Sequence, residues 1–207
     1  MKLLIMGAQG AGKGTAAEQL SKIYNIPTIS TGDLFRAIVK TDSDLARKVK
    51  GIIEKGELVP DELTLSVLQD RLEKDDCQNG YILDGFPRTL DQAKMLETIT
   101  SIDKVIFLEV EKAIVLERIA GRRTCPKCSH IHNIKYPGDP EYCSECGTKY
   151  IIRADDTPEA IENRLATFAT KTLPIVDYYK QKGLVLSVDS NVSPQATIDQ
   201  IVKGLGK

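Results

Sequence analysis

A glycine-rich string near the N-terminus is the segment whose chemistry is easiest to read. Residues 7–15 follow the apolar run Lys2–Met6 and lead into helical spacing over Thr15–Tyr24. In such a strand, loop and helix, glycines turn the backbone N–H groups inward and the helix start adds partial positive charge. Lys13 can then reach the β and γ oxygens of a nucleotide. A plain strand-to-helix turn is the alternative, but it requires neither four glycines nor a lysine.

The end of this loop departs from the generic phosphate-loop pattern. That pattern places Ser or Thr directly after the lysine, whereas Gly14 follows Lys13 here and Thr15 comes next. The departure indicates a subclass of phosphate-binding loops.

Two Cys-x-x-Cys pairs lie further along the chain, with fourteen residues between them: Cys125, Cys128, Cys143 and Cys146. This spacing suits four thiolates around one tetrahedral zinc ion, and four sulfurs leave no open position for a substrate. We therefore expect a structural zinc that folds a segment too small to bury a core. Two redox dithiols are the alternative. Cys77 receives no role, and His130 and His132 are expected to be loop residues rather than ligands.

Two short segments each contain one arginine, and we call them the arginine segments: Ser30–Arg36 and Asp84–Thr89. A guanidinium offers two parallel charge-assisted hydrogen bonds to a phosphate, so both segments are candidate phosphate sites. The alternative for Arg36, taken without its neighbours, is a solvent-exposed charge on the surface of a helix. Asp84 ends an apolar strand beside the loop, where it could orient the waters of Mg²⁺ or simply cap a helix.

A second group of arginines brackets the cysteine pairs: Arg118, Arg122, Arg123, Arg153 and Arg164. Arg118 and Arg122 are four residues apart, so they share a face if they lie on a helix. These side chains are candidates to hold a small anionic ligand.

The remaining pattern must position these groups. We expect strands at the apolar runs Lys2–Met6, Tyr81–Leu83, Val105–Val110 and Leu184–Val188, with Pro27–Ser30 as a further short strand. Helical patterns separate them, at Asp61–Lys74, Leu90–Ile99 and Pro158–Lys182, the last kinked at Pro174. This alternation predicts an α/β core of three layers with a central parallel sheet.

Two stretches interrupt the alternation. Thr31–Val59 is helical and charged without a strand of its own, and Arg122–Asp156 is rich in Cys, Pro and Gly without a helical period. We interpret both as insertions into the core.

Composition narrows the class of protein. At 207 residues the chain suits one core with insertions, and its 42% hydrophobic and 28% charged residues are ordinary for a globular protein. A formal net charge of −1 gives no reason to expect a nucleic-acid partner. The apolar N-terminal run is too short for a signal peptide, and no stretch could span a bilayer. We therefore expect a cytoplasmic protein with reduced thiols.

The phosphate loop and the two arginine segments together resemble the adenylate kinases, over nearly the whole chain. The loop has their Gly-Lys-Gly-Thr ending, although Gln9 stands where they usually have proline, and Ala154 replaces a residue that is often lysine. The resemblance implies a phosphate-loop core (1–29, 60–121 and 157–207), a helical AMP-binding insertion (30–59) and a zinc-binding lid (122–156). It implies Mg-dependent phosphoryl transfer, ATP + AMP = 2 ADP, by a monomer that uses ATP, AMP and ADP.

The resemblance also assigns residue roles. It implies catalytic charges at Lys13, Arg88, Arg122, Arg153 and Arg164. It implies ATP contacts at Gly10, Ala11, Gly12, Lys13, Gly14, Thr15, Arg118, Arg122, Ile131 and His132. It implies AMP contacts at Thr31, Arg36, Glu57, Leu58, Val59, Gly85, Phe86, Pro87, Arg88, Gln92, Arg153 and Arg164, with Asp84 on the magnesium waters.

Three other functions remain open. A kinase of another nucleoside monophosphate would share these signatures, because the choice of base depends on few contacts. A phosphate-loop hydrolase or switch protein would need a water-positioning residue and a strand-borne acidic magnesium site, for which only Asp84 is a candidate. A zinc ribbon that binds nucleic acid is disfavoured by the near-neutral charge.

Overall fold

A five-stranded parallel sheet forms the centre of the computed structural model, which describes residues 1–206. Its strand order is β2-β3-β1-β4-β7. The strands are β1 (Lys2–Gly7), β2 (Thr28–Ser30), β3 (Tyr81–Asp84), β4 (Lys104–Glu109) and β7 (Val185–Asp189). Each expected strand is present within two residues of its expected ends.

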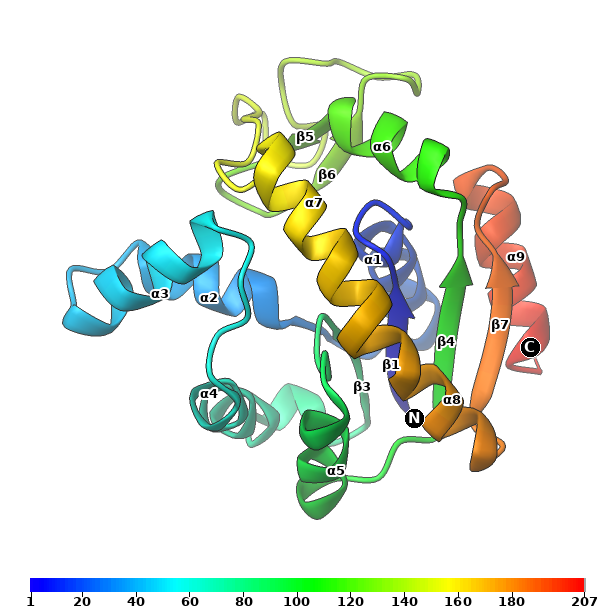
Figure 1. The fold of residues 1–207 in the computed structure, drawn as a ribbon. Helices are drawn as coiled ribbons and strands as arrows, with labels where there is room; N and C mark the ends of the chain where they lie inside the picture. The colour runs from blue at the N-terminus through cyan, green and yellow to red at the C-terminus, as the bar shows by residue number, and fades with distance from the viewer. Residues whose placement is uncertain (207) are drawn as a thin grey trace.

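Helices cover both faces of the sheet (Figure 1). On one face lie α1 (Lys13–Tyr24) and α9 (Pro194–Gly204); on the other lie α4 (Asp61–Leu72), α5 (Leu90–Ile99) and α8 (Leu173–Gln181). Alternate residues of a strand point to opposite faces. Leu4 and Met6 of β1 accordingly pack with α4, α5 and α8, whereas Leu3 and Ile5 pack with α1 and α9. The expected three-layer α/β core is confirmed.

The long helical pattern before β7 is divided into two helices. α7 (Pro158–Thr167) continues through a wide π-helical turn, Phe168–Thr172, into α8. Pro174 lies in the first turn of α8 and has no N–H to donate to the preceding turn, so the regular ladder cannot run through this point. The interruption therefore comes just before the expected kink. A further helix, α6 (Lys112–Ala120), follows β4.

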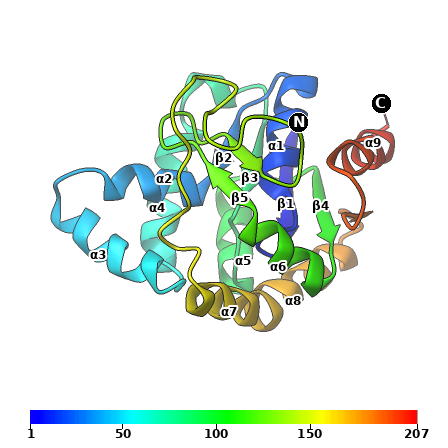
Figure 2. The ribbon, with the colours of Figure 1, turned by 90° about the horizontal axis from the view of Figure 1, so that it is seen from above.

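The segment between β2 and α4 projects away from the sheet. It contains α2 (Thr31–Val39) and α3 (Asp44–Glu54), and Figure 2 shows both on the side of the molecule opposite α9. Its own small core contains Phe35, Val49 and Val59. We call residues 30–59 the helical segment.

The cysteine-rich residues form a small antiparallel unit beside α6 and α7 (Figure 1). Strands β5 (Arg122–Thr124) and β6 (Ile131–Asn133) pair within it, and Cys125, Cys143 and Tyr150 are buried together. We call residues 122–156 the cysteine segment. Such a small apolar cluster is poor support for a fold, as expected for a unit that depends on a metal.

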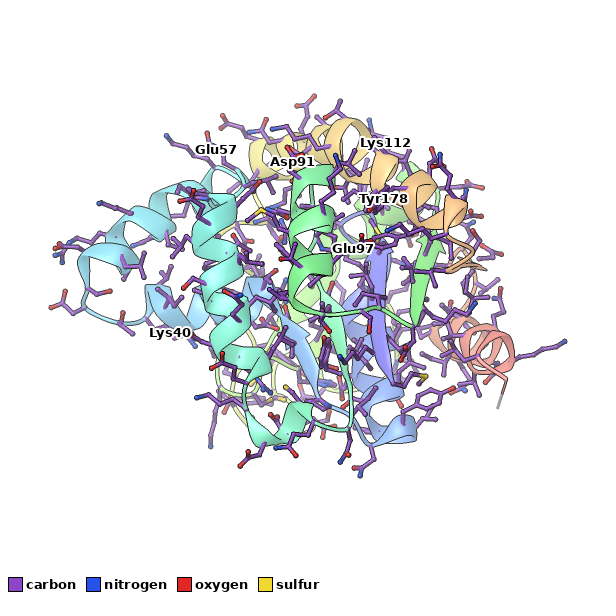
Figure 3. The ribbon with its side chains drawn as sticks, turned by 90° about the horizontal axis from the view of Figure 1, so that it is seen from below. Lys40, Glu57, Asp91, Glu97, Lys112 and Tyr178 are labelled. Atoms are coloured by element: carbon purple, nitrogen blue, oxygen red, sulfur yellow. The ribbon has the colours of Figure 1, made fainter. Side chains whose placement is uncertain are left out.

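Polar contacts join the helices on one outer face. Glu97 of α5 accepts hydrogen bonds from Tyr178 and Lys182, at 2.9 and 2.5 Å, and Figure 3 shows Glu97 pointing toward Tyr178 on α8. A short 3₁₀ turn, Asp75–Cys77, precedes β3. Within residues 1–206, no helix is long and apolar enough to cross a membrane.

Candidate active site

A cavity of about 830 Å³ opens at the carboxyl ends of the parallel strands, the usual place for a ligand in such a sheet. The phosphate loop, the helical segment and the cysteine segment all contribute to its walls. Every residue predicted to bind a nucleotide or the magnesium waters lines this cavity except three: Ala11, Phe86 and His132.

Each of those three has a side chain packed against other parts of the protein. Phe86 is 1% exposed and belongs to the main core. Ala11 is fully buried, and its carbonyl accepts a 2.7 Å hydrogen bond from Ser190. His132 stacks on Tyr150 with ring centroids 5.8 Å apart. The sequence places all three beside binding residues but does not show which way they point.

The phosphate loop presents a helix start without a side-chain cap. Gly12, at φ 92°, is the N-cap of α1 and makes no side-chain capping bond, whereas Ser30, Thr89 and Ser193 cap α2, α5 and α9. A left-handed backbone at this point favours glycine. The first N–H groups of α1 are therefore left for an anion, as a phosphate-binding helix requires.

Lys13 is held inside this loop. Its ammonium group donates to the carbonyls of Gly7 and Ala8, both at 2.8 Å. Burial lowers the pKa of Lys13 to about 8; the Asp84 carboxylate opposes the shift, and the charge of Arg88 adds to it. A polyphosphate would reverse this shift because it supplies the missing negative charge.

Gly14 makes room for the cysteine segment. A Cβ atom at this position would lie 3.0 Å from Cδ1 of Ile131, which is closer than an ordinary carbon–carbon contact. The glycine that departs from the generic loop pattern therefore lies directly beneath a side chain of β6. Two further contacts bring the cysteine segment over the cavity: Lys40 donates to the Pro126 carbonyl at 2.8 Å, and His130 Nδ1 lies 3.4 Å from Glu18 Oε2.

On the other side of the cavity, arginines are held by their neighbours. Arg36 pairs with Asp33 on α2. Arg88 donates from Nε to the Gly85 carbonyl at 2.7 Å, and burial, followed by the charge of Arg164, lowers its pKa. An arginine whose charged form is disfavoured by burial and by neighbouring positive charge gains stability when it binds an anion.

Gln92 links the backbone of Arg88 to helix α4. Its Oε1 accepts from the backbone N–H of Arg88 at 2.7 Å, and its Nε2 donates to Asp61 at 2.6 Å. The residue is 2% exposed. Gln92 lines the cavity as expected, but part of its hydrogen-bonding capacity is already used to join α4 to the arginine segment.

Two aspartates at the end of the cysteine segment hold two more arginines. Asp156 accepts from Arg122, with Nε 3.0 Å from Oδ2 and Nη2 close to Oδ1. Asp155 pairs with Arg164. Burial disfavours the charged form of Asp155, but Arg164 outweighs that effect and holds the pKa of the carboxyl below its ordinary value. Neither carboxylate is marked by the residue pattern as an arginine partner.

Arg153 completes the positive group. Its Nε donates to Thr124 Oγ1 at 3.0 Å. Burial lowers its pKa to about 10, and the charges of Arg36 and Arg122 add to the shift. Arginines from four separate parts of the chain thus repel one another around one cavity, which makes that cavity suited to a multiply charged anion.

Arg118 lies at the edge of the cavity on α6. Its guanidinium donates to Ser190 Oγ at 3.3 Å and to the Val192 carbonyl at 3.1 Å. Ser190 is 2% exposed and also contacts the phosphate loop through Ala11. Sequence reasoning missed Ser190 because it belongs to no motif; its position directly after β7 was the only available signal.

Asp84 fits a role on hydrated magnesium. It ends β3 beside the phosphate loop, and its Oδ1 is buried without a hydrogen-bond partner within the described part of the chain. A buried carboxylate oxygen needs a donor, and the waters of Mg²⁺ are donors of the right kind. Asp84 is not an N-cap residue of any described helix.

The four predicted zinc ligands come together. Their potential ligand atoms lie within 4.8 Å of one another, with Cys125 Sγ 3.4 Å from Cys146 Sγ and Cys128 Sγ 3.5 Å from Cys143 Sγ. Sulfurs at about 2.3 Å from one tetrahedral zinc would be separated by about 3.8 Å. The cluster therefore fits zinc with small side-chain adjustments.

Comparison with known proteins shows which family the chain belongs to. The sequence model of the adenylate kinase family matches residues 5–184. An adenylate kinase of Treponema denticola is 44% identical over 200 residues, covering 96% of each chain. Those of Clostridium perfringens and Caldicellulosiruptor bescii are 42% and 43% identical over 213 residues, covering all of this chain and 99% of each relative. The chain therefore belongs to the adenylate kinase family.

Proposed function

We propose that this family member performs its reaction in the cavity described above, with the positive side chains that surround it. The chain is an ATP:AMP phosphotransferase and converts ATP and AMP into two ADP. The observation that supports the site assignment is the convergence of Lys13 with arginines from four parts of the chain around one cavity. Burial, with neighbouring positive charges, lowers the pKa of Lys13, Arg88 and Arg153.

The donor and acceptor phosphates approach from opposite sides. The uncapped start of α1 and Lys13 bind the ATP phosphates, with Gly10, Ala11, Gly12, Gly14 and Thr15 contributing backbone and hydroxyl groups. Arg36 and Arg88 bind the AMP phosphate. Arg122, Arg153 and Arg164 lie between them and balance the charge on the transferring group, for which in-line positioning and positive charge are the main requirements. An oxygen of the AMP phosphate is the nucleophile.

The bases are bound at the two ends of the cavity. Arg118 stacks on the ATP adenine, and Ile131 covers the ATP side together with the backbone near His132. Thr31, Gln92 and the stretch Glu57, Leu58 and Val59 surround the AMP adenine, next to Gly85 and Pro87. The role of Phe86 is to support this wall from the core, in keeping with its burial.

The proposed enzyme has two metal sites, one for the reaction and one for the fold. Mg²⁺ enters with ATP, and when bound it neutralises phosphate charge. Asp84 would hold its waters through the buried oxygen that lacks a protein donor among residues 1–206. A structural Zn²⁺ would be held by Cys125, Cys128, Cys143 and Cys146. Four thiolates leave no open position, so the zinc takes no part in transfer.

The two projecting segments are the moving parts in this proposal. The helical segment, 30–59, binds AMP, and the cysteine segment, 122–156, is the lid over ATP, inserted into the core of 1–29, 60–121 and 157–207. Closing both excludes water, which protects ATP from hydrolysis. We place the enzyme in the cytoplasm as a monomer, in agreement with cysteines grouped for a metal rather than for disulfides.

The experiment is product analysis with purified protein and Mg-ATP, offered AMP, GMP, CMP or UMP separately, with a sample that lacks an acceptor. The proposal predicts two ADP formed for each AMP consumed and little product with the other acceptors. Preference for another monophosphate would keep the phosphate sites but overturn the assignment of the AMP base contacts. Phosphate release without an acceptor would overturn the proposed exclusion of water.

A further inference from the structure

Gln9 joins the phosphate loop to the end of the cysteine segment. Its Nε2 donates to Oδ1 of Asp156 at 3.2 Å, across 147 residues of sequence. The same carboxylate holds Arg122, whose Nε lies 3.0 Å from Oδ2 and whose Nη2 contacts Oδ1. The Asp156 side chain is only 3% exposed, so water does not compete for this contact. Gln9 is thus in direct contact with the anchor of a proposed catalytic arginine.

The orientation of the Gln9 amide is fixed by its partner. Turning the amide over would place Oε1 against the Asp156 carboxylate, and two acceptors would then face each other. Nε2 must therefore face Asp156. Oε1 is left buried without a hydrogen-bond partner in residues 1–206, which is a cost to the fold. The hydrogen bond from Nε2 to Asp156 is therefore the polar contact that Gln9 makes at this position.

We propose that Gln9 is a positioning residue for phosphoryl transfer, which holds the Asp156 carboxylate, and through it Arg122, against the phosphate loop. The proposal rests on the assigned role of Arg122. Asp156 Oδ1 receives both the amide and one arm of the guanidinium, so the amide fixes where the carboxylate lies. Proline, which the resemblance leads one to expect at this position, has no side-chain donor and cannot make this contact.

The test compares three substitutions. Gln9→Met keeps the length of the side chain but removes the donor, and we expect kcat/KM to fall about tenfold, the size of one lost charge-assisted hydrogen bond, with KM for AMP unchanged. Gln9→Glu should fall further because a second carboxylate then faces Asp156. Gln9→Pro should resemble Gln9→Met. The melting temperature of Gln9→Met should hold or rise, because the buried Oε1 is removed as well.

The control is Gln195→Met. Gln195 also donates to an aspartate, Asp199, at 2.8 Å, but on the exposed surface of α9, so kcat/KM should be unchanged. A second arm combines Gln9→Met with Arg122→Lys. If Gln9 acts through Arg122, Gln9→Met causes no further loss in the Arg122→Lys background.

The outcomes separate this proposal from the function on which it rests. Native kcat/KM in Gln9→Met and Gln9→Glu, while Arg122→Lys alone is strongly impaired, would overturn the role of Gln9 only. Losses that multiply in the double variant would do the same, because Gln9 would then act independently of Arg122. Native kcat/KM in Arg122→Lys alone would overturn the assignment of Arg122, and the proposal for Gln9 with it.

Discussion

Replacing Gly14 with alanine should make the folded protein more stable but the enzyme slower. Gly14 lies in the first turn of α1, beneath the Ile131 side chain of the cysteine segment. Alanine is favoured over glycine by up to about 1 kcal/mol in a helix interior and by less in the first turn, so the melting temperature should rise slightly when the cysteine segment moves away from the loop. The new methyl group, however, would lie 3.0 Å from Ile131 Cδ1 when the cysteine segment covers the loop.

The free-energy cost of this close contact depends on how far the Cδ1 atom of Ile131 can move away. Overpacking costs about 1–3 kcal/mol, and the low end applies here because Cδ1 is the mobile tip of a side chain. About 1 kcal/mol against closure corresponds to roughly a fivefold loss. The loss should appear in kcat/KM for ATP, which compares the free enzyme with the closed transition state.

The assay is steady-state kinetics of Gly14→Ala together with thermal unfolding, and Ile131→Val provides the rescue. Valine lacks Cδ1, so the double variant should recover kcat/KM while keeping the gain in melting temperature. Ile131→Val alone should be near native. A double variant as slow as Gly14→Ala would show that the methyl group acts on the phosphate contacts and not through Ile131.

Three further predictions concern the metal, the lysine and the buried ion pairs. Metal analysis should find about one zinc per chain, and Cys125→Ser should lower the melting temperature more than the transfer rate; an equally stable protein without metal would contradict the zinc site. Because burial lowers the pKa of Lys13 to about 8 and ATP favours its charged form, ATP affinity measured by calorimetry should be full below pH 8 and fall by up to about tenfold per unit above it; an affinity flat to pH 9.5 would contradict the contact. Asp155→Ala removes the partner of the partly buried Arg164 and should lower the free energy of unfolding by about 1.5–3 kcal/mol in urea, a loss that a surface control, Asp42→Ala, should not show.

Features that are contiguous in the sequence could be predicted best. The phosphate loop, the two Cys-x-x-Cys pairs and the strands carry their own local signals, since glycine, cysteine spacing and apolar runs each have one main structural use. The expected sheet and its covering helices were found within two residues at each strand end.

Contacts between distant segments could not be predicted in the same way. Gln9 and Asp156 are 147 residues apart, and Ser190 reaches Ala11 across 179 residues, with no pattern that links either pair. The stacking of His132 on Tyr150 depends on how β6 is placed in the cysteine segment. The sequence therefore indicated which arginines enter the site but not which carboxylates hold them.

The catalytic role of the positive charge around the cavity can be tested by measuring the transfer rates of Lys13→Met and Arg88→Lys together with their melting temperatures. If the positive charge around the cavity lowers the barrier to transfer, both variants should lose two or more orders of magnitude in turnover while remaining folded. Folded variants that convert ATP and AMP into ADP at near-native rates would contradict the central claim.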